Sequence, residues 1–300
     1  MDNFNSLIAD AELGSFSTLM DDADLIYLYD GTLEGMLSSV FAAYGRHEHP
    51  KNIVEAHDLQ ESMLCSYVPI RTELRYAARV QKGIVEQLGD RAYEDVKTVF
   101  LSDDTNKGGV IYRFLRYAFK AGRWSMSHIS EPPVADFLEI RKQVENEAHY
   151  MLMFVRFAHL QNGVFYAHIE PKASVVPLIT DHFARRLNVQ PFIIYDSVHG
   201  LASVFDTERW WLVSSDEINL PAHSCVEDDY QALWQTFYDT IAIEERRNPR
   251  CQRNFMPKRF WGNMCEHIPP ELRKTKPSTE TPTHAARLQA GSQKLLDAPL

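Results

Sequence analysis

Cysteine is scarce in this chain, and no long apolar run occurs in it. Among its 300 residues are 4 cysteines, at positions 65, 225, 251 and 265, and none forms a Cys-x-x-Cys pair. A zinc ribbon or a disulfide framework is therefore not expected, whereas a reducing compartment is. No apolar stretch approaches the ~20 residues of a membrane span. The N-terminal stretch also lacks the basic region and apolar run of a signal peptide. These absences predict a cytoplasmic protein.

The short motifs that identify many enzymes are absent as well. The sequence contains no GxxxxGK[S/T], GxGxxG, GxSxG or HExxH, the patterns of common nucleotide, nucleophile and zinc sites. His47, His49 and His57 lie near one another in the sequence, but this stretch is typical of a loop, and His-x-His chelates best on a strand. We therefore expect no metal and no cofactor.

Apolar periodicity divides the chain into a mainly helical part, residues 24–150, and a part with a sheet, residues 151–268. A buried strand is predicted at 25–29, followed by a helix capped by Asp30 or Thr32. A long helix beginning near Pro133 is expected to change to a strand near Met153. From there the apolar pattern has a period of two, and Asn162-Gly163 favours a hairpin turn.

One more helix at 174–187, three short strands and a last helix from about 228 complete the expected elements. Their short connections predict antiparallel pairing. The predicted fold class is α+β, with one antiparallel β-sheet over about residues 151–214 flanked by helices. We expect residues 1–23 to be an extension, 24–268 one globular unit, and the polar residues 269–300 a disordered tail.

Positive charge is low overall and concentrated locally. The formal net charge is -10, yet residues 246–259 carry no acidic residue. The basic residues of this segment are Arg246, Arg247, Arg250, Arg253, Lys258 and Arg259. Guanidinium groups suit phosphates, and nearby Phe255, Phe260 or Trp261 could stack an unpaired base. Alternatively, the cations pair with carboxylates on a solvated face, and Phe260 and Trp261 anchor the core.

A second basic cluster consists of Arg113, Arg116, Lys120 and Arg123, at spacings of three, four and three. On a helix these residues share one face. The preceding Gly108-Gly109 pair could bring backbone N–H groups close to a phosphate. A solvated helix face explains the same pattern.

Polar side chains also gather around the predicted sheet, where histidine and carboxylate together could perform acid–base catalysis. The candidates for that role are Glu147, His149, Glu170 and His182, and Arg156, Tyr166, His168, Arg186 and Asp196 accompany them. Structural pairs in the interior are the competing interpretation.

Several long blocks resemble one bacterial family. They include "IYLYDGTLEGMLSSVFAAY", "ENEAHYMLMFVRF", "VFYAHIEPKASVVPLITDHFARRL", "PFIIYDSVHGLASVFD" and "LWQTFYDTIAIEERRNPRCQRNFMPKRFWGNM". That family is assigned to DNA repair or DNA metabolism because it is encoded beside a radical-SAM protein. A related domain is fused to members of the uracil-DNA glycosylase superfamily. The resemblance covers most of residues 24–265 and supplies no catalytic residues.

The resemblance implies a DNA-repair accessory protein that binds DNA through its arginines and works with a radical-SAM or glycosylase-type partner. This chain lacks the CxxxCxxC motif of radical-SAM enzymes, so radical chemistry would belong to that partner. Two alternatives stay open: an enzyme acting on a damaged base or nucleotide, and a protein-interaction scaffold without nucleic-acid contact. No catalytic activity of its own is evident.

Overall fold

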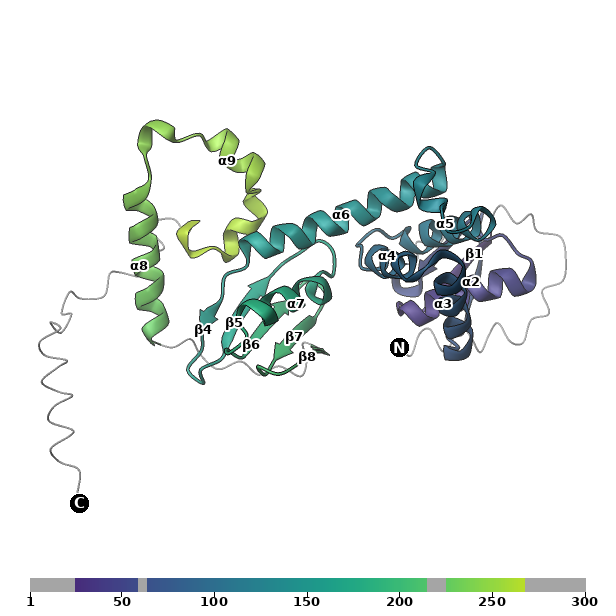
Figure 1. Cartoon of the computed structure of the whole chain (residues 1–300), viewed down its shortest axis with the longest axis horizontal. Coiled ribbons are helices and arrows are strands. Elements are labelled where there is room, and N and C mark those ends of the chain that lie inside the picture. Colours follow the sequence, from purple (N-terminus) through teal and green to yellow (C-terminus); the bar gives the residue numbers. More distant parts are fainter. Residues whose placement is uncertain (1–24, 59–63, 215–224, 268–300) are drawn as a thin grey trace, which may run out of the picture.

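The computed structural model describes residues 25–58, 64–214 and 225–267. The predictions for residues 1–23 and 269–300 lie outside this range. The described chain builds two hydrophobic cores, each against its own sheet, and one long helix contributes to both (Figure 1).

The first sheet has three parallel strands in the order β2-β1-β3. β1 (Leu25–Tyr29) lies between β2 (Asn52–Glu55) and β3 (Ser66–Pro69). The predicted strand at 25–29 is confirmed. The Thr32 side chain caps the following helix, α2 (Leu33–Arg46), by accepting from the Gly35 N–H. β2 and β3 went unpredicted because neither "NIVE" nor "SYVP" alternates apolar and polar residues.

Three further helices pack with α2 around this sheet. They are α3 (Leu74–Leu88), α4 (Asp90–Phe100) and α5 (Lys107–Ala121). α5 approaches β2 very closely at Gly108 and Gly109. A Cβ atom at Gly108 would lie 2.4 Å from the Ile53 carbonyl oxygen, and one at Gly109 would lie 1.9 Å from Asn52 Oδ1. The glycine pair is therefore explained by helix–strand packing.

α6 (Pro132–Phe154) joins the two cores. Its buried stripe begins with Val134, Phe137 and Ile140 in the first core and continues with Val144, Ala148 and Met151 in the second. The predicted start near Pro133 is confirmed, and so is the predicted end of the helix near Met153, but the strand does not follow at once. The helix continues to Phe154, and the next strand begins only at Ala158.

The second sheet has five strands in the order β4-β5-β6-β7-β8. These are β4 (Ala158–His159), β5 (Phe165–Ile169), β6 (Phe192–Asp196), β7 (Leu201–Phe205) and β8 (Trp210–Ser214). β4 and β5 form the expected antiparallel pair around Asn162-Gly163, with Gly163 at φ 84°.

The prediction of one antiparallel sheet is wrong, because the first sheet is wholly parallel and the second is mixed. β5 pairs with β6 in parallel, whereas the other pairs of this sheet are antiparallel. The physical reason is the helix between paired strands. α7 (Val176–Arg186) connects β5 to β6 as a crossover, and a crossover through a helix joins parallel strands. α2 does the same between β1 and β2.

The C-terminal part of the described chain leaves the sheet and comes back to α6. α8 (Cys225–Ile241) is followed by a short 3₁₀ turn, η5 (Glu244–Arg246), and by α9 (Pro249–Phe255). The chain then returns through η6 (Lys258–Asn263) and η7 (Cys265–His267) to the C-terminal end of α6 (Figure 1). Phe260 anchors this return by packing against Tyr150 and Phe154 of α6.

Candidate functional site

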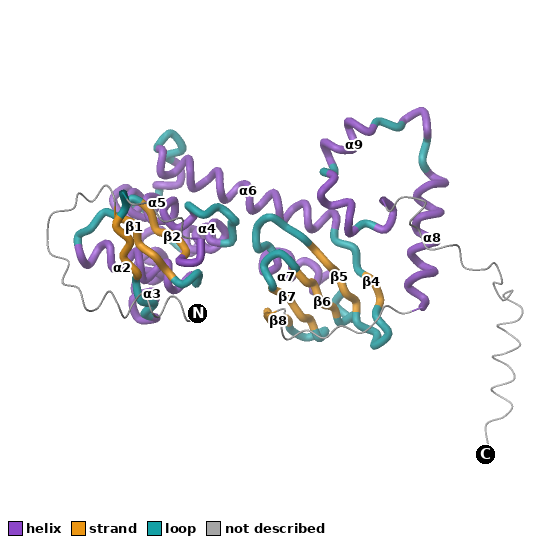
Figure 2. The backbone as a smooth tube through the Cα atoms, turned by 180° about the vertical axis from the view of Figure 1, so that it is seen from behind, coloured by secondary structure: helices purple, strands orange, loops and turns teal. Residues whose placement is uncertain are grey.

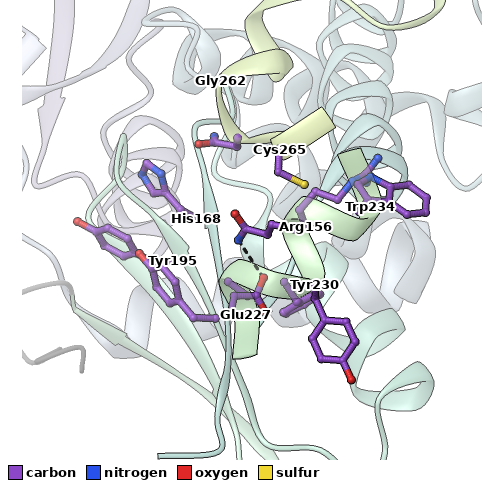
Figure 3. A pocket seen from close by; sticks show the side chains of 13 residues that line it. Arg156, His168, Tyr195, Glu227, Tyr230, Trp234, Gly262 and Cys265 are labelled. Carbon is purple, nitrogen blue, oxygen red and sulfur yellow. Dashed lines mark hydrogen bonds between the residues drawn. The ribbon is translucent and has the colours of Figure 1, made fainter. Parts of the chain in front are cut away.

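A cleft of about 880 Å³ lies between the second sheet, α8 and the returning η6–η7 segment (Figure 3). Its polar and aromatic lining includes Arg156, Tyr166, His168, Tyr195, Glu227, Tyr230, Gln231, Trp234, Asn263 and Cys265. Three of these, Arg156, Tyr166 and His168, belong to the polar group that the sequence places around the sheet. The cleft therefore collects residues from five separate stretches of the chain.

The sheet wall of the cleft is an aromatic platform, by which we mean Tyr166, His168 and Tyr195. His168 on β5 stands directly beside Tyr195 on β6 in the strand register. The Tyr195 ring lies nearly parallel to both neighbours, with centroids 6.5 Å from Tyr166 and 5.8 Å from His168. Alternate residues of both strands face the core instead, so the pleat alone presents these rings to the cleft.

One hydrogen bond and one shifted pKa further characterise the platform. His168 Nε2 lies 2.8 Å from Ser197 Oγ, just beyond the end of β6. Burial, with a smaller effect of Tyr195, raises the pKa of Tyr166. The Tyr166 hydroxyl is therefore neutral at physiological pH and presents a hydrogen-bonding group at the edge of an apolar surface.

Arg156 contributes a guanidinium group that other residues already hold in place. Its Nη2 and Nε donate to Glu266 Oε1 at 2.8 and 3.3 Å, and its Nη1 donates to the carbonyls of Met153 and Val155. Burial alone would raise the pKa of Glu266, but the hydrogen bonds and charge of Arg156 outweigh it and lower that pKa. The Arg156 charge is thus compensated locally.

The α8 wall is fixed to β4 and η7 by buried polar side chains. Glu227 accepts from the His159 backbone N–H and from Gln231 Nε2, both at 2.9 Å. Gln235 Nε2 donates to the Cys265 carbonyl at 2.9 Å. Burial, followed by the nearby Glu266 charge, raises the pKa of the Cys265 thiol to about 11.

The apolar stripe of α8 remains largely exposed. Trp234, Phe237 and Ile241 have exposed fractions of 43%, 52% and 57%. Trp234 lines the cleft, and its ring lies 5.6 Å from that of Phe237. Tyr238, on the adjacent face, contacts His267. The cleft therefore has an apolar rim as well as an aromatic wall.

The basic segment of residues 246–259 follows α8 directly and leads into the η6–η7 wall. Arg246, Arg250, Arg253 and Lys258 are exposed, and none has an ion-pair partner within the described residues. Arg247 pairs with Glu244 at 3.2 Å. The Asn248 side chain caps α9 by accepting from the Cys251 N–H at 3.0 Å. Asn248 and Pro249 therefore mark the start of this helix.

The three aromatic residues in and just after this segment differ in their exposure to solvent. Phe255 has an exposed fraction of 75%, whereas that of Phe260 is 6%. Trp261 stacks on His267, with centroids 4.5 Å apart, and donates from Nε1 to the Met256 carbonyl. Only Phe255 is thus open to solvent.

Arg259 and Glu147, which the sequence assigned to different roles, bind each other. Arg259 donates to both carboxylate oxygens of Glu147, with Nη1 at 2.6 Å from Oε1. Glu147 Oε1 also accepts from the Lys172 backbone N–H at 2.9 Å. This buried carboxylate is therefore fully engaged in holding η6 against α6.

The remaining acid–base candidates lie away from the cleft. His149, Glu170 and His182 are exposed, and none of them lines it. In the described part of the chain, no three His, Cys, Asp or Glu side chains are grouped so that they could hold a metal ion.

The second basic cluster lies apart from the first. Arg113, Arg116 and Lys120 are on α5, beside the N-terminal half of α6, and Arg123 follows that helix. α9 lies instead near the C-terminal end of α6, and both views of the molecule agree on this separation (Figures 1 and 2). The two clusters do not form one continuous surface.

Sequence reasoning missed Tyr195, Glu227, Gln231 and Asn263 as cleft residues. Phe192 to Tyr195 in "PFIIYD" are all apolar or aromatic, so no alternation in the sequence shows which way Tyr195 faces. No local signal marks the other three, because they reach the cleft only through the packing of α8 and η6.

Comparison with protein families finds one match. The family model that matches residues 105–266, more than half of the chain, is described as a domain of unknown function, DUF4130. A search of curated proteins finds no match to the chain. Within the described residues, every helix is too short or too polar to cross a membrane.

Proposed function

The chain belongs to the DUF4130 family, and from the geometry of its cleft we propose that it binds single-stranded nucleic acid. The observation that carries this proposal is that the basic segment and the wall of the cleft follow each other directly in the chain. A segment with four exposed, unpaired cations runs directly into the wall of an aromatic cleft. Phosphates and unstacked bases are the two ligand features that such a combination suits.

The phosphate contacts would come from Arg246, Arg250, Arg253 and Lys258. Binding phosphates releases counterions from the nucleic acid, which favours association at low salt. The molecule as a whole is acidic, with a formal net charge of -10, so repulsion confines the strand to this segment. We assign Arg259 a structural role, since its Nη1 and Nη2 both donate to the Glu147 carboxylate.

A base would stack on the aromatic platform. Tyr166, His168 and Tyr195 present roughly parallel rings to a cleft of about 880 Å³, which is large enough for a nucleotide. Stacking on aromatic faces tolerates any base, because every base has a π-face. Paired bases are stacked inside a duplex, so this arrangement favours single strands.

A role as an accessory protein in DNA repair, with a radical-SAM or glycosylase-type partner, follows from the family resemblance alone. The placement of His149, Glu170 and His182 outside the cleft favours binding over catalysis. In this proposal the protein holds a strand, and chemistry belongs to the partner.

The decisive experiment measures the affinity for a fluorescent oligonucleotide as a function of salt. Arg250→Glu with Arg253→Glu should weaken binding at least tenfold at low salt and flatten the dependence on salt, because about 0.7 counterions are released per phosphate contact. The matched control is Arg185→Glu with Arg186→Glu, on exposed positions of α7. Equal losses in both variants, or none in either, would contradict the proposal.

The stacking part is tested with Tyr195→Ala against Tyr195→Phe. Losing one stacked base costs about 1–3 kcal/mol, so Tyr195→Ala should bind roughly 5- to 150-fold more weakly while Tyr195→Phe stays close to the original protein. An abasic strand should show no such difference. If Tyr195→Ala binds as the original protein does, no base enters the cleft.

A further inference from the structure

A second concave surface lies in the first half of the molecule, between α2, α3 and α5. This groove has a volume of about 300 Å³ and is lined mainly by apolar groups. Val40, Phe41 and Tyr44 come from α2, Val80 from α3 and Phe119 from α5. Gly83 adds no side chain, so it leaves the groove open on the α3 side. Tyr44 has an exposed fraction of 45% although it contacts the Phe119 ring.

Cations surround this groove. The Arg79 guanidinium lies 5.0 Å from the centroid of the Phe41 ring. Arg116 stands on α5 three residues before Phe119 and so shares its face of the helix, and Lys120 stands four residues after Arg116, directly next to Phe119 in the chain. Arg123 lies near Gly89, at the C-terminal end of α3. These four cations have no ion-pair partner within the described residues.

The chemistry of the groove therefore fits an acidic segment with a narrow apolar stripe. Residues 1–24 of this chain have that composition, with six acidic residues and no basic one. Leu13, Phe16 and Met20 follow one another at the spacing of a single helix face. Acidic residues 21, 22 and 24 come next. An amphipathic helix seated in an apolar groove is a common recognition mode.

Chain connectivity brings this segment to the groove. It enters the described structure at Leu25, whose carbonyl accepts from the Lys51 N–H at 2.8 Å. Tyr27, two residues later, donates its hydroxyl to Glu48, just past the end of α2. Tyr44 of the groove is in the last turn of that helix. The five residues from Met20 to Leu25 can span at most roughly 17 Å, which limits Met20 to this neighbourhood.

We propose that residues 13–24 of this chain dock in the groove between α2, α3 and α5 and place their carboxylates against Arg79, Arg116, Lys120 and Arg123. This contact gives the basic cluster of α5 an intramolecular role that is separate from the cleft and from α9. It also covers cations that would otherwise attract other polyanions.

The test is photo-cross-linking in the full chain, with benzoylphenylalanine in place of Phe16 and peptide mapping by mass spectrometry. The cross-links should fall on peptides that contain residues 40–44, 79–87 or 116–120. Arg116→Glu with Lys120→Glu should lower their yield at least fivefold, whereas Arg185→Glu with Arg186→Glu should leave it unchanged. Asp21→Asn with Asp22→Asn should lower the yield too, and it changes no residue of the groove itself.

Mixing chains of natural and heavy isotopic composition separates contacts within one chain from contacts between two. Cross-links confined to one chain at the groove support the proposal. The proposal would be overturned by cross-links between two copies or at sites other than the groove. It would also be overturned if the cross-linking yield stayed the same in both charge variants.

Discussion

At the scale of single residues, the cleft contains a cysteine thiol whose surroundings keep it protonated. The Cys265 thiol lines the cleft beside Glu266, with Sγ 3.7 Å from Oε2. Burial and the neighbouring carboxylate both disfavour the thiolate, and they raise the pKa of Cys265 to about 11. Because the thiolate is the nucleophile in cysteine chemistry, Cys265 is not built as a catalytic nucleophile at neutral pH.

We expect iodoacetamide to alkylate exposed Cys251 at pH 8 and to leave Cys265 almost unmodified. A pKa of about 11 leaves only ~0.1% of the Cys265 thiol ionised at pH 8. Its rate should then rise about tenfold per pH unit up to pH 10. Peptide mass spectrometry after short exposures measures both rates, and equal rates at pH 8 would contradict the assignment.

At the scale of elements, the Gly108-Gly109 pair has a packing role that the sequence does not reveal. Gly108-Gly109 before a basic helix suggests a phosphate-binding turn. In the structure, both residues are buried within the first turn of α5, and β2 fills the space where their side chains would lie. The pair therefore sets the distance between a helix and a strand, and Arg113 lies on the same helix face as Gly109, with its Nη1 3.2 Å from the position of a Cβ there.

Gly108→Ala should lower the free energy of unfolding by about 1–3 kcal/mol, because its Cβ would meet the backbone carbonyl of Ile53 at 2.4 Å. Gly45→Ala in α2 is the matched control, since nothing lies within 4 Å of its Cβ position. There the higher helix propensity of alanine should add about 0.5–1 kcal/mol. Urea unfolding measures both, and a stabilised Gly108→Ala variant would refute the packing argument.

At the scale of the whole molecule, α6 connects two cores that have separate sheets. Phe137 is fully buried in the first core, where it stacks on Phe114 at 4.0 Å, and Phe192 is fully buried in the second. The loop before α7 also touches the end of α4, through a hydrogen bond from the Ser174 N–H to the Leu101 carbonyl. The cleft and the basic segment belong to the second core, and the groove belongs to the first.

Phe137→Ala and Phe192→Ala should each destabilise the core that holds the residue, by about 3–5 kcal/mol. Hydrogen–deuterium exchange should accelerate mainly in residues 25–121 for Phe137→Ala and mainly in residues 158–214 for Phe192→Ala. Uniform acceleration in both variants would instead indicate one cooperative unit across α6.

Features that depend on neighbours along the chain can be predicted from the amino-acid sequence alone. These include β1, the Thr32 cap of α2 and the Asn162-Gly163 hairpin. Periodicity, caps and turn residues act within a few positions, so they can be read from a short window. The concentration of positive charge at 246–259 was visible for the same reason.

Three other features depend on the folded arrangement as a whole: which strands pair, which charges neutralise each other and where the cleft lies. Parallel pairing depends on how α2 and α7 cross their sheets. The bond between Arg259 and Glu147 joins residues 112 positions apart. The aromatic platform becomes a cleft only when α8 and η7 pack across from it. Such contacts come from the burial of apolar surface and the closure of long loops, and no local pattern encodes their outcome.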